Sequence, residues 1–452
     1  MASTKDILSA QRFNRSRLVT AFQSGMPDGR ELTPARPWTG LIGGIIITVL
    51  IFGVAWVSRL FAPSLPAGWE DSSLITDPDT GGRYVTIGGT LHPVANASSA
   101  KLLFPGGLKV LTAGSSTLDD VPLGDPVGIL GAPDQLPAPE ALADSYILSC
   151  VDTTGASPVL WTGVNSGEWS DAEGLATHVQ FDGVSYLVTN GHRYVLGGQG
   201  VAPEGILNAL GLSTDTAVTV NASWLNLFPE GEPLEPLQVP NLGDDAGAIT
   251  GVGDDVRVGT VLRVSDSAQE GDLYLVRAAG TIERMSPSMF QLYSVGAGAI
   301  YADPQDITLH DLARLNIAPD RIRPTWPQEL TRLLNEDEIA CGYTDSSDSM
   351  GEPDFVVAGE LPQANLSGVS VAPHSGAILH TLTEGGVGVF LFVDENGVAH
   401  PLGSPQSTLA ALGLADADTL RVTPAWSELF VPGVLLSEDA AWQTVPVEDD
   451  AQ

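Results

Sequence analysis

The sequence contains only three lysines and two cysteines, and it lacks the short motifs that mark common catalytic sites. A P-loop needs the pattern Gly-x-x-x-x-Gly-Lys-Ser/Thr, because its backbone amides hold phosphates and its lysine reaches them. None of Lys5, Lys101 and Lys109 stands in that pattern, and the stretch Gly106-Gly107-Leu108-Lys109 lacks both the spacing and a following hydroxyl residue. The sequence therefore excludes a nucleotide site of this type and argues against an enzyme.

Hydrolase and metal motifs are missing as well. No stretch matches the Gly-x-Ser-x-Gly elbow of serine hydrolases, and the seven histidines form no His-Glu-x-x-His or other compact zinc pattern. Three of them, His92, His192 and His400, follow hairpin turns, which favours semi-exposed structural positions over metal ligands. We expect no catalytic residue, no cofactor and no metal.

One long uncharged apolar run is present, at residues 37–58. Arg36 and Arg59 flank it, and Trp38 and Trp56 lie near its ends, where interfacial tryptophans belong. A bilayer core about 30 Å thick needs about 20 apolar residues in a helix. The run therefore predicts a single transmembrane helix that tethers the rest of the chain.

The charges around this run indicate its orientation. The leader, residues 1–36, carries six basic residues against three acidic ones, whereas the first basic residue beyond Arg59 is Arg83. Because positive flanks stay in the cytoplasm, we expect a cytosolic leader and an extracytoplasmic body in the inner (plasma) membrane. The alternative, a cleaved signal peptide, would have a shorter leader, a shorter apolar segment and a small-x-small cleavage site.

The leader also predicts a short basic amphipathic helix over residues 3–25, with Ser3 or Thr4 as cap and Gly25 as its end. Attraction to the inner leaflet and docking on a cytosolic protein account for this pattern equally well. The residues predicted to make these contacts, or to lie at the membrane surface, are Arg12, Phe13, Arg15, Arg17, Phe22, Trp38 and Trp56.

Basic residues are scarce in the body. Beyond residue 60 there are 13 Lys and Arg against 52 Asp and Glu, a net charge of −39. Phosphate binding needs a basic face, so nucleic acid is excluded as a partner. Cys150 and Cys341, both in the body, favour a disulfide in an extracytoplasmic compartment over buried free thiols or a catalytic thiolate.

Short apolar runs separated by turn signals predict an α+β, β-rich body. Hairpin signals stand at residues 84–94, 186–196 and 390–402, the last two around Asn-Gly turns. Residues 186–234 and 390–435 share a longer pattern: a hairpin, a helix ending in Ala-Leu-Gly-Leu, then Trp and Leu-Phe. Weaker copies lie near 74–118 and 271–320, so we expect four related repeat modules around a central β domain. The predicted repeat-core residues are Trp224, Phe228, Trp426 and Phe430.

The predicted segments are the cytosolic leader 1–36, the transmembrane helix 37–58, the juxtamembrane linker 59–73, repeat 1 at 74–120, a connector with part of the central domain at 121–180, repeat 2 at 181–236, a central β-strand segment at 237–268, repeat 3 at 269–320, a second connector with part of the central domain at 321–385, repeat 4 at 386–437 and a frayed tail at 438–452.

These residues resemble one family along most of the chain. The leader, with Lys5, Gln11-Arg12-Phe13, Arg15 and Arg17, resembles the cytosolic segment of EccB, a core component of the actinobacterial ESX (type VII) secretion system. Residues 74–103 resemble the first EccB repeat, and residues 127–133 resemble the approach to its first cysteine.

The resemblance implies four repeat modules placed pseudo-symmetrically about a central β-rich domain, with a disulfide between Cys150 and Cys341. It implies a structural role in an inner-membrane complex with an EccC-type ATPase, EccD, EccE and the mycosin protease, and possible contact with peptidoglycan. The family is sometimes labelled an ATPase, and the missing P-loop argues against that activity for this chain. Two alternatives stay open, an ATP-hydrolysing enzyme of the same system and a stand-alone peptidoglycan-binding anchor.

Overall fold

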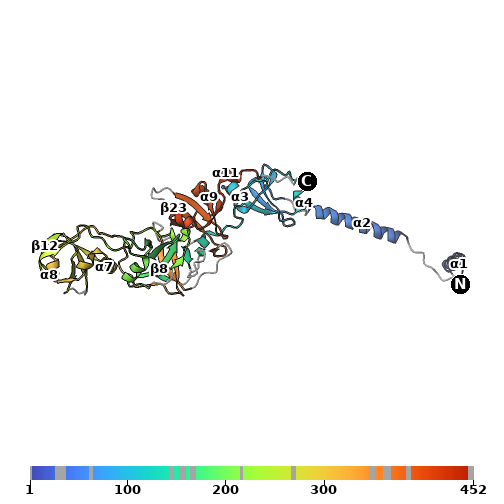
Figure 1. Cartoon of the computed structure of the whole chain (residues 1–452). Helices are drawn as coiled ribbons and strands as arrows, with labels where there is room; N and C mark the ends of the chain where they lie inside the picture. The colour runs from blue at the N-terminus through green and yellow to red at the C-terminus, as the bar shows by residue number, and fades with distance from the viewer. Residues whose placement is uncertain are drawn as a thin grey trace. The chain divides into compact units, whose positions relative to one another are not determined.

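The computed structural model divides the chain into two compact units, Met1–Pro66 and Ala67–Gln452 (Figure 1). The residues that it describes are 3–25, 37–60, 65–142, 146–151, 159–162, 169–213, 217–265, 271–345, 352–359, 368–382 and 388–445.

The first unit contains two helices, α1 (Thr4–Ser24) and α2 (Pro37–Leu60). The predicted helix ends are confirmed: the Ser3 side chain accepts a hydrogen bond at the start of α1, in a capping box with Asp6, and Gly25 ends it in the left-handed conformation. Over the residues that the structure describes, no helix combines the length and the apolar character needed to cross a membrane. The side chains of residues 55–60, including Trp56, lie outside the described residues.

In the second unit, four sheets share one order of connections, and we call each sheet with its helices a lobe (Figure 1). Three antiparallel strands are followed by a helix, a strand parallel to the first one, and a one-turn helix. The chain then returns along the third strand, again in parallel. All four lobes therefore have the same connectivity.

Lobe 1 comprises β1 (Ser73–Thr76), β2 (Arg83–Ile87), β3 (Thr90–Pro93), α3 (Ala97–Leu103), β4 (Lys109–Thr112) and α4 (Ser115–Leu118). Lobe 2 comprises β8 (Leu175–Phe181), β9 (Val184–Thr189), β10 (His192–Val195), α5 (Pro203–Ala209), β11 (Val218–Thr219) and α6 (Ala222–Leu225). Lobe 3 comprises β14 (Val261–Val264), β15 (Leu273–Ala278), β16 (Thr281–Met285), α7 (Pro287–Ser294), η2 (Ala297–Tyr301), β17 (Gln305–Ile307), α8 (Leu309–Leu312) and β18 (Asn316–Ile317). Lobe 4 comprises β23 (Ala377–Leu382), β24 (Gly388–Val393), β25 (Val398–Pro401), α9 (Pro405–Leu412), β26 (Thr419–Val422), α10 (Pro424–Ser427) and β27 (Val431–Pro432).

A fifth, central sheet has the strand order β22-β6-β5-β20-β21-β7. Its strands come from two stretches of chain that flank lobes 2 and 3: β5 (Tyr146–Val151), β6 (Val159–Thr162), β7 (Trp169–Asp171), β20 (Ile339–Asp345), β21 (Asp354–Ala358) and β22 (Val369–Val371). A separate ribbon joins β12 (Asp245–Ile249) to β13 (Gly253–Arg257), η1 (Pro139–Leu142) precedes β5, α11 (Glu438–Ala441) follows lobe 4, and β19 (Arg332–Leu333) adds to β8.

The hairpin predictions at residues 84–94, 186–196 and 390–402 are confirmed by the antiparallel pairs β2–β3, β9–β10 and β24–β25. Between β9 and β10 the pair Thr189–His192 closes directly over Asn190 and Gly191, which both have positive φ. A two-residue turn with these dihedrals matches the twist of the two strands. The Asn-Gly signal therefore fixed this register.

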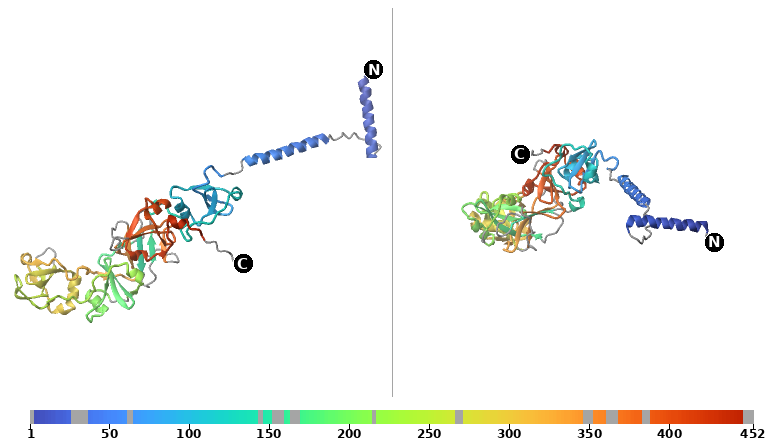
Figure 2. Two further views of the ribbon diagram at one scale, coloured as in Figure 1. Left: turned by 90° about the horizontal axis from the view of Figure 1, so that it is seen from above. Right: turned by 90° about the vertical axis from the view of Figure 1, so that its right-hand side faces the viewer.

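The buried apolar side chains join the lobes in pairs. One cluster combines residues of lobes 1 and 4, and another combines lobes 2 and 3. A third packs lobes 2 and 4 against the central sheet. Lobe 1 (blue) and lobe 4 (red), which are far apart in the sequence, accordingly lie side by side in both further views (Figure 2).

Two expectations from the sequence were wrong. The run Val261–Val264, expected in a central sheet, is the first strand of lobe 3, because it pairs with β15 and β17. His400 is buried with 1% exposure instead of semi-exposed, with Nε2 3.6 Å from Oδ2 of Asp394. The sheets of lobes 2, 3 and 4 also begin before residues 181, 269 and 386, since each first strand precedes the hairpin that signals the repeat.

Candidate assembly site

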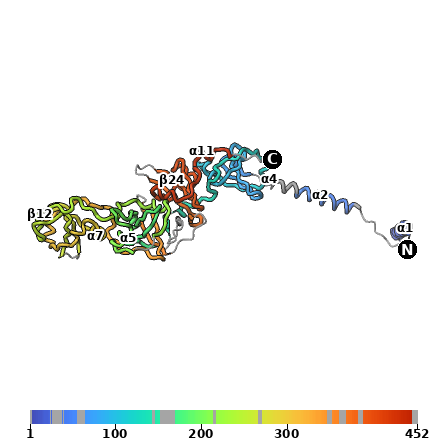
Figure 3. The backbone as a smooth tube through the Cα atoms, viewed as in Figure 1, coloured from blue at the N-terminus to red at the C-terminus, as the bar shows by residue number. Residues whose placement is uncertain are grey.

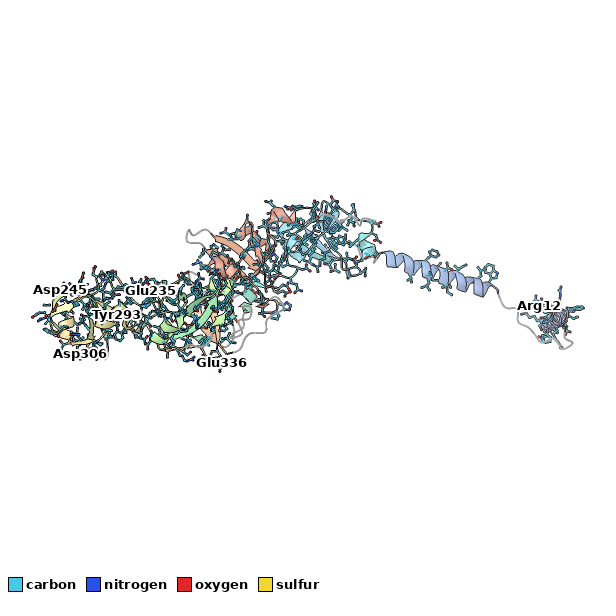
Figure 4. All side chains as sticks on the ribbon, in the orientation of Figure 1. Arg12, Glu235, Asp245, Tyr293, Asp306 and Glu336 are labelled. Carbon is cyan, nitrogen blue, oxygen red and sulfur yellow. A yellow bond between two sulfur atoms is a disulfide. The ribbon has the colours of Figure 1, made fainter. Side chains whose placement is uncertain are left out.

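The helix α1 presents apolar and basic side chains together, and the described ones are exposed or half-buried (Figure 4, where Arg12 is labelled). At 3.6 residues per turn, Leu8, Arg15 and Phe22 fall on one line along the helix. Val19 lies close to this line, Ile7 and Leu18 widen the stripe on one side of it, and the exposed fraction of Phe22 is 86%. This face combines a wide apolar stripe with a cation at its centre.

The remaining predicted contact residues of α1 do not share that face. Phe13 lies nine residues before Phe22, which is half a turn out of phase. Arg17 lies near Phe13, whereas Arg12 lies at the edge of the apolar stripe. The helix is therefore less strictly amphipathic than the sequence pattern suggested. Trp38, at the start of α2, is 75% exposed, and Trp56 has no described side chain.

The disulfide joins Cys150 to Cys341, which face each other on the neighbouring strands β5 and β20. Both cysteines are buried, and the rings of Tyr146, Trp169 and Tyr343 pack together in the same cluster, with centroids 4.8 to 5.9 Å apart. Because β5 precedes lobe 2 and β20 follows lobe 3, the bond closes a loop that contains both of these lobes. The disulfide thus ties the two halves of the central sheet.

The repeated Trp and Phe residues lie where lobes 2 and 4 meet the central sheet. Trp224 and Trp426 are both 0% exposed. The Trp224 indole Nε1 donates a hydrogen bond to the Ser149 carbonyl oxygen of β5 (3.0 Å), so the ring anchors lobe 2 to the central sheet. Phe228 and Phe430 belong to the same cluster. All four residues are therefore buried at the interface between their lobe and the central sheet, rather than in the interior of a single lobe.

One of the three lysines lies at the junction of lobes 1 and 4. Lys101 Nζ on α3 donates to the Leu412 carbonyl oxygen at the end of α9 (2.8 Å). Partial burial lowers the pKa of Lys101. A cation at a helix C-terminus is favourable because the last carbonyl groups have no partner within the helix. This lysine therefore holds α3 and α9 together.

Sequence reasoning missed a cleft of about 510 Å³ in lobe 3. It is lined by the start of β15, the end of β16, the first turn of α7 and the segment that follows β18, and it includes Arg284, Phe290 and Arg321. The available signal was a difference between lobes. The residues that follow the last helix of lobes 1, 2 and 4 include a buried aliphatic one at Val127, Leu234 and Leu436, whereas the corresponding residue of lobe 3 is Arg321. In the ranges that the structure describes, no three His, Cys, Asp or Glu side chains come together as a metal site.

Known proteins resemble this chain over nearly its full length. The family model "Type VII secretion system ESX-1, transport TM domain B" matches residues 1–447. The ESX-3 secretion system ATPase EccB3 of Mycobacterium tuberculosis is 26% identical, covering 88% of this chain and 81% of the relative. The ESX-2 secretion system ATPase EccB2 of the same organism is also 26% identical, covering 97% and 94%.

Two solved structures share the fold. A chain of an intact ESX-5 inner membrane complex aligns with a TM-score of 0.65 and 19% identity, covering 100% of this chain and 98% of that one. A chain of the EccB3 dimer from the ESX-3 core complex aligns with a TM-score of 0.66 and 21% identity, covering 82% and 99%. Both share the mixed, β-rich α/β architecture. Given the match of the family model over residues 1–447, this chain belongs to the EccB family of type VII secretion proteins.

Proposed function

We propose that this chain is a structural core subunit of a type VII (ESX) secretion complex in the inner membrane. The observation that carries the proposal is the family match, which includes the leader, the apolar helix and the body together. The structure adds that buried aromatic residues connect lobes 2 and 4 to the central sheet, and that the disulfide joins the two halves of this sheet.

The uncharged stretch 37–58 crosses the membrane as one helix in this proposal, with α1 in the cytoplasm and the body outside. The charge difference across the stretch supports this orientation. A disulfide in the body supports it as well, because such bonds persist in oxidising compartments.

The four lobes represent four repeat modules of one ancestral unit, placed about the central sheet. Their common order of strands and helices supports this reading. The pairing supports it further, since the equivalent helices meet in both pairs, α3 with α9 and α5 with α7. The body then builds the outer side of the channel assembly.

The partners are an EccC-type ATPase, EccD, EccE and the mycosin protease, and the exposed mixed face of α1 supplies a contact on the cytosolic side. Deleting residues 1–36 should remove the partners from the complex that a tag on this chain recovers from host membranes. A matched variant carries glutamine at Arg12, Arg15 and Arg17, and its control carries glutamine at Arg257, Arg263 and Arg314 of the body. Complete recovery of the partners without the leader would contradict the proposal.

The relatives carry the name ATPase, so ATP hydrolysis is the second candidate function. Purified full-length chain, free of partners, would then release phosphate from ATP at a rate proportional to its concentration. A stand-alone wall anchor would instead sediment with peptidoglycan in the absence of every partner.

A further inference from the structure

Lobes 1, 2 and 4 close their third strand in the same way. The chain returns along the outer edge of that strand and pairs with it at two places, the second of which is a single backbone bridge at a buried aliphatic residue. These second bridges are Val94–Val127, Leu196–Leu234 and Leu402–Leu436.

Each second bridge uses the same pair of hydrogen bonds. In lobe 2, the Leu234 N–H donates to the Val195 carbonyl oxygen (2.9 Å), and the Gly197 N–H donates to the Leu234 carbonyl oxygen (3.1 Å). Val127 makes the corresponding pair in lobe 1 and Leu436 in lobe 4, with lengths of 2.8 to 3.2 Å. One aliphatic residue thus completes the sheet edge and fills the core beside it.

Among its described residues, lobe 3 pairs only at the first of these two places. Ile317 pairs with Ile282, and the Ala318 N–H donates to the Ile282 carbonyl oxygen (2.7 Å). By register, the second pair would use the outward Arg284 carbonyl oxygen and the Ser286 N–H. Neither group has a hydrogen-bond partner among the residues that the structure describes.

In lobe 3, polar contacts hold the segment that follows β18 away from the edge of β16. The buried Glu283 accepts a hydrogen bond from the Ile322 N–H (2.9 Å) and lies 3.3 Å from Arg277. Arg277 also donates to the Asp320 carbonyl oxygen (3.1 Å). Arg321, which stands where the other lobes have Val127, Leu234 and Leu436, is therefore exposed.

The space left behind is the cleft of about 510 Å³. Leu273, Met285 and Phe290 supply apolar lining, and Arg284 and Arg321 supply cations. Arg284 is paired with Asp272 (2.9 Å), whereas Arg321 forms no salt bridge within the described ranges and interacts with the buried Glu283 through its charge alone. In Figure 3 the label α7 marks lobe 3, the lobe to which this edge belongs.

We propose that this cleft binds an extended polypeptide segment of a partner, in parallel with β16. An aliphatic side chain of the partner takes the place that Leu234 has in lobe 2, and its backbone bonds to the Arg284 carbonyl oxygen and the Ser286 N–H. A carboxylate beside the aliphatic residue pairs with Arg321, as Glu235 beside Leu234 pairs with Arg323 (2.8 Å). This binding goes beyond a role in assembly, since the cleft is complete without the leader or the membrane.

The test uses full-length chain in detergent micelles and a fluorescent octapeptide of residues 231–238, GEPLEPLQ, whose sequence closes lobe 2. Fluorescence anisotropy should show saturable binding, and a peptide with aspartate in place of the first leucine should not bind. Ser286→Pro removes the N–H while its φ of −77° already suits proline. We expect it to weaken binding about tenfold.

The matched control is Ser286→Ala, which loses the same side-chain cap of α7 and keeps the N–H. It should bind like the wild type. If Ser286→Pro shows an altered melting curve, the charge pair decides: Arg321→Glu should weaken binding about tenfold, and Arg314→Glu, outside the cleft, should not. Equal affinities within the deciding pair, or no saturable binding to the wild type, would overturn the proposal.

Discussion

At the scale of single residues, the role of Trp224 and Trp426 follows from the strand β20, on which lobes 2 and 4 pack. Gly342 of β20 faces lobes 2 and 4 together, and a Cβ there would stand 3.2 Å from Phe228 and 3.5 Å from Trp426. A side chain here would press on Phe228 and contact Trp426, so the glycine lets both rings pack closely on the strand. The sequence indicated that these residues are buried. Only the packing shows that they attach two lobes to the same strand of the central sheet.

Trp224→Ala should lower the free energy of unfolding of the body by about 3–5 kcal/mol, because it leaves a large cavity and removes the bond to Ser149. Trp442→Ala is the control: this ring is 45% exposed and makes one edge contact with Phe104, so about 1 kcal/mol is expected. Urea titration followed by circular dichroism measures both. Equal losses would show that Trp224 does not anchor lobe 2.

At the scale of elements, the hairpin turns were predictable because their requirements are local. Gly191 and Gly280 both have positive φ, at +71° and +65°, and both sit at hairpin tips. Their surroundings differ, since a Cβ on Gly191 would collide with the Pro353 carbonyl oxygen, while nothing lies within 4 Å of one on Gly280. Local propensity therefore predicts the turn, whereas tertiary contacts decide how much stability is lost when the glycine is replaced.

Gly280→Ala should cost about 1 kcal/mol, the strain of a left-handed alanine. Gly191→Ala should cost about 3 kcal/mol, because the same strain is added to a clash with a carbonyl group that cannot rotate away. Thermal unfolding of the two variants side by side compares them. A Gly191 variant no less stable than the Gly280 variant would refute the contact with Pro353.

At the scale of the whole molecule, the central sheet depends on chain segments separated by lobes 2 and 3. The Cys150–Cys341 bond spans a sequence separation of 191 residues, which is a long closed loop for the unfolded chain. Long loops lose the most conformational entropy when they are closed, so the bond should stabilise the body substantially.

Replacing both cysteines by alanine should lower the free energy of unfolding by about 2–5 kcal/mol. Val356→Ala trims the same buried cluster and keeps the bond, so it should cost only about 1–2 kcal/mol. Adding reductant should destabilise the wild type and the Val356 variant but not the double variant. An unchanged wild type in reductant after full reduction would contradict the stabilising role.

The sequence by itself determined what depends on neighbours along the chain. It indicated the hairpin registers, the ends of α1 at Ser3 and Gly25, the chemistry excluded by missing motifs, and the repeating Trp and Phe positions. Tertiary structure alone decided that Val261–Val264 belongs to lobe 3, that lobe 1 packs on lobe 4, and that His400 is buried. It also decided that Arg321 leaves the edge of lobe 3 open, through the pull of Arg277 and Glu283. Such contacts join residues whose spacing carries no local signal, and only packing and paired charges select them.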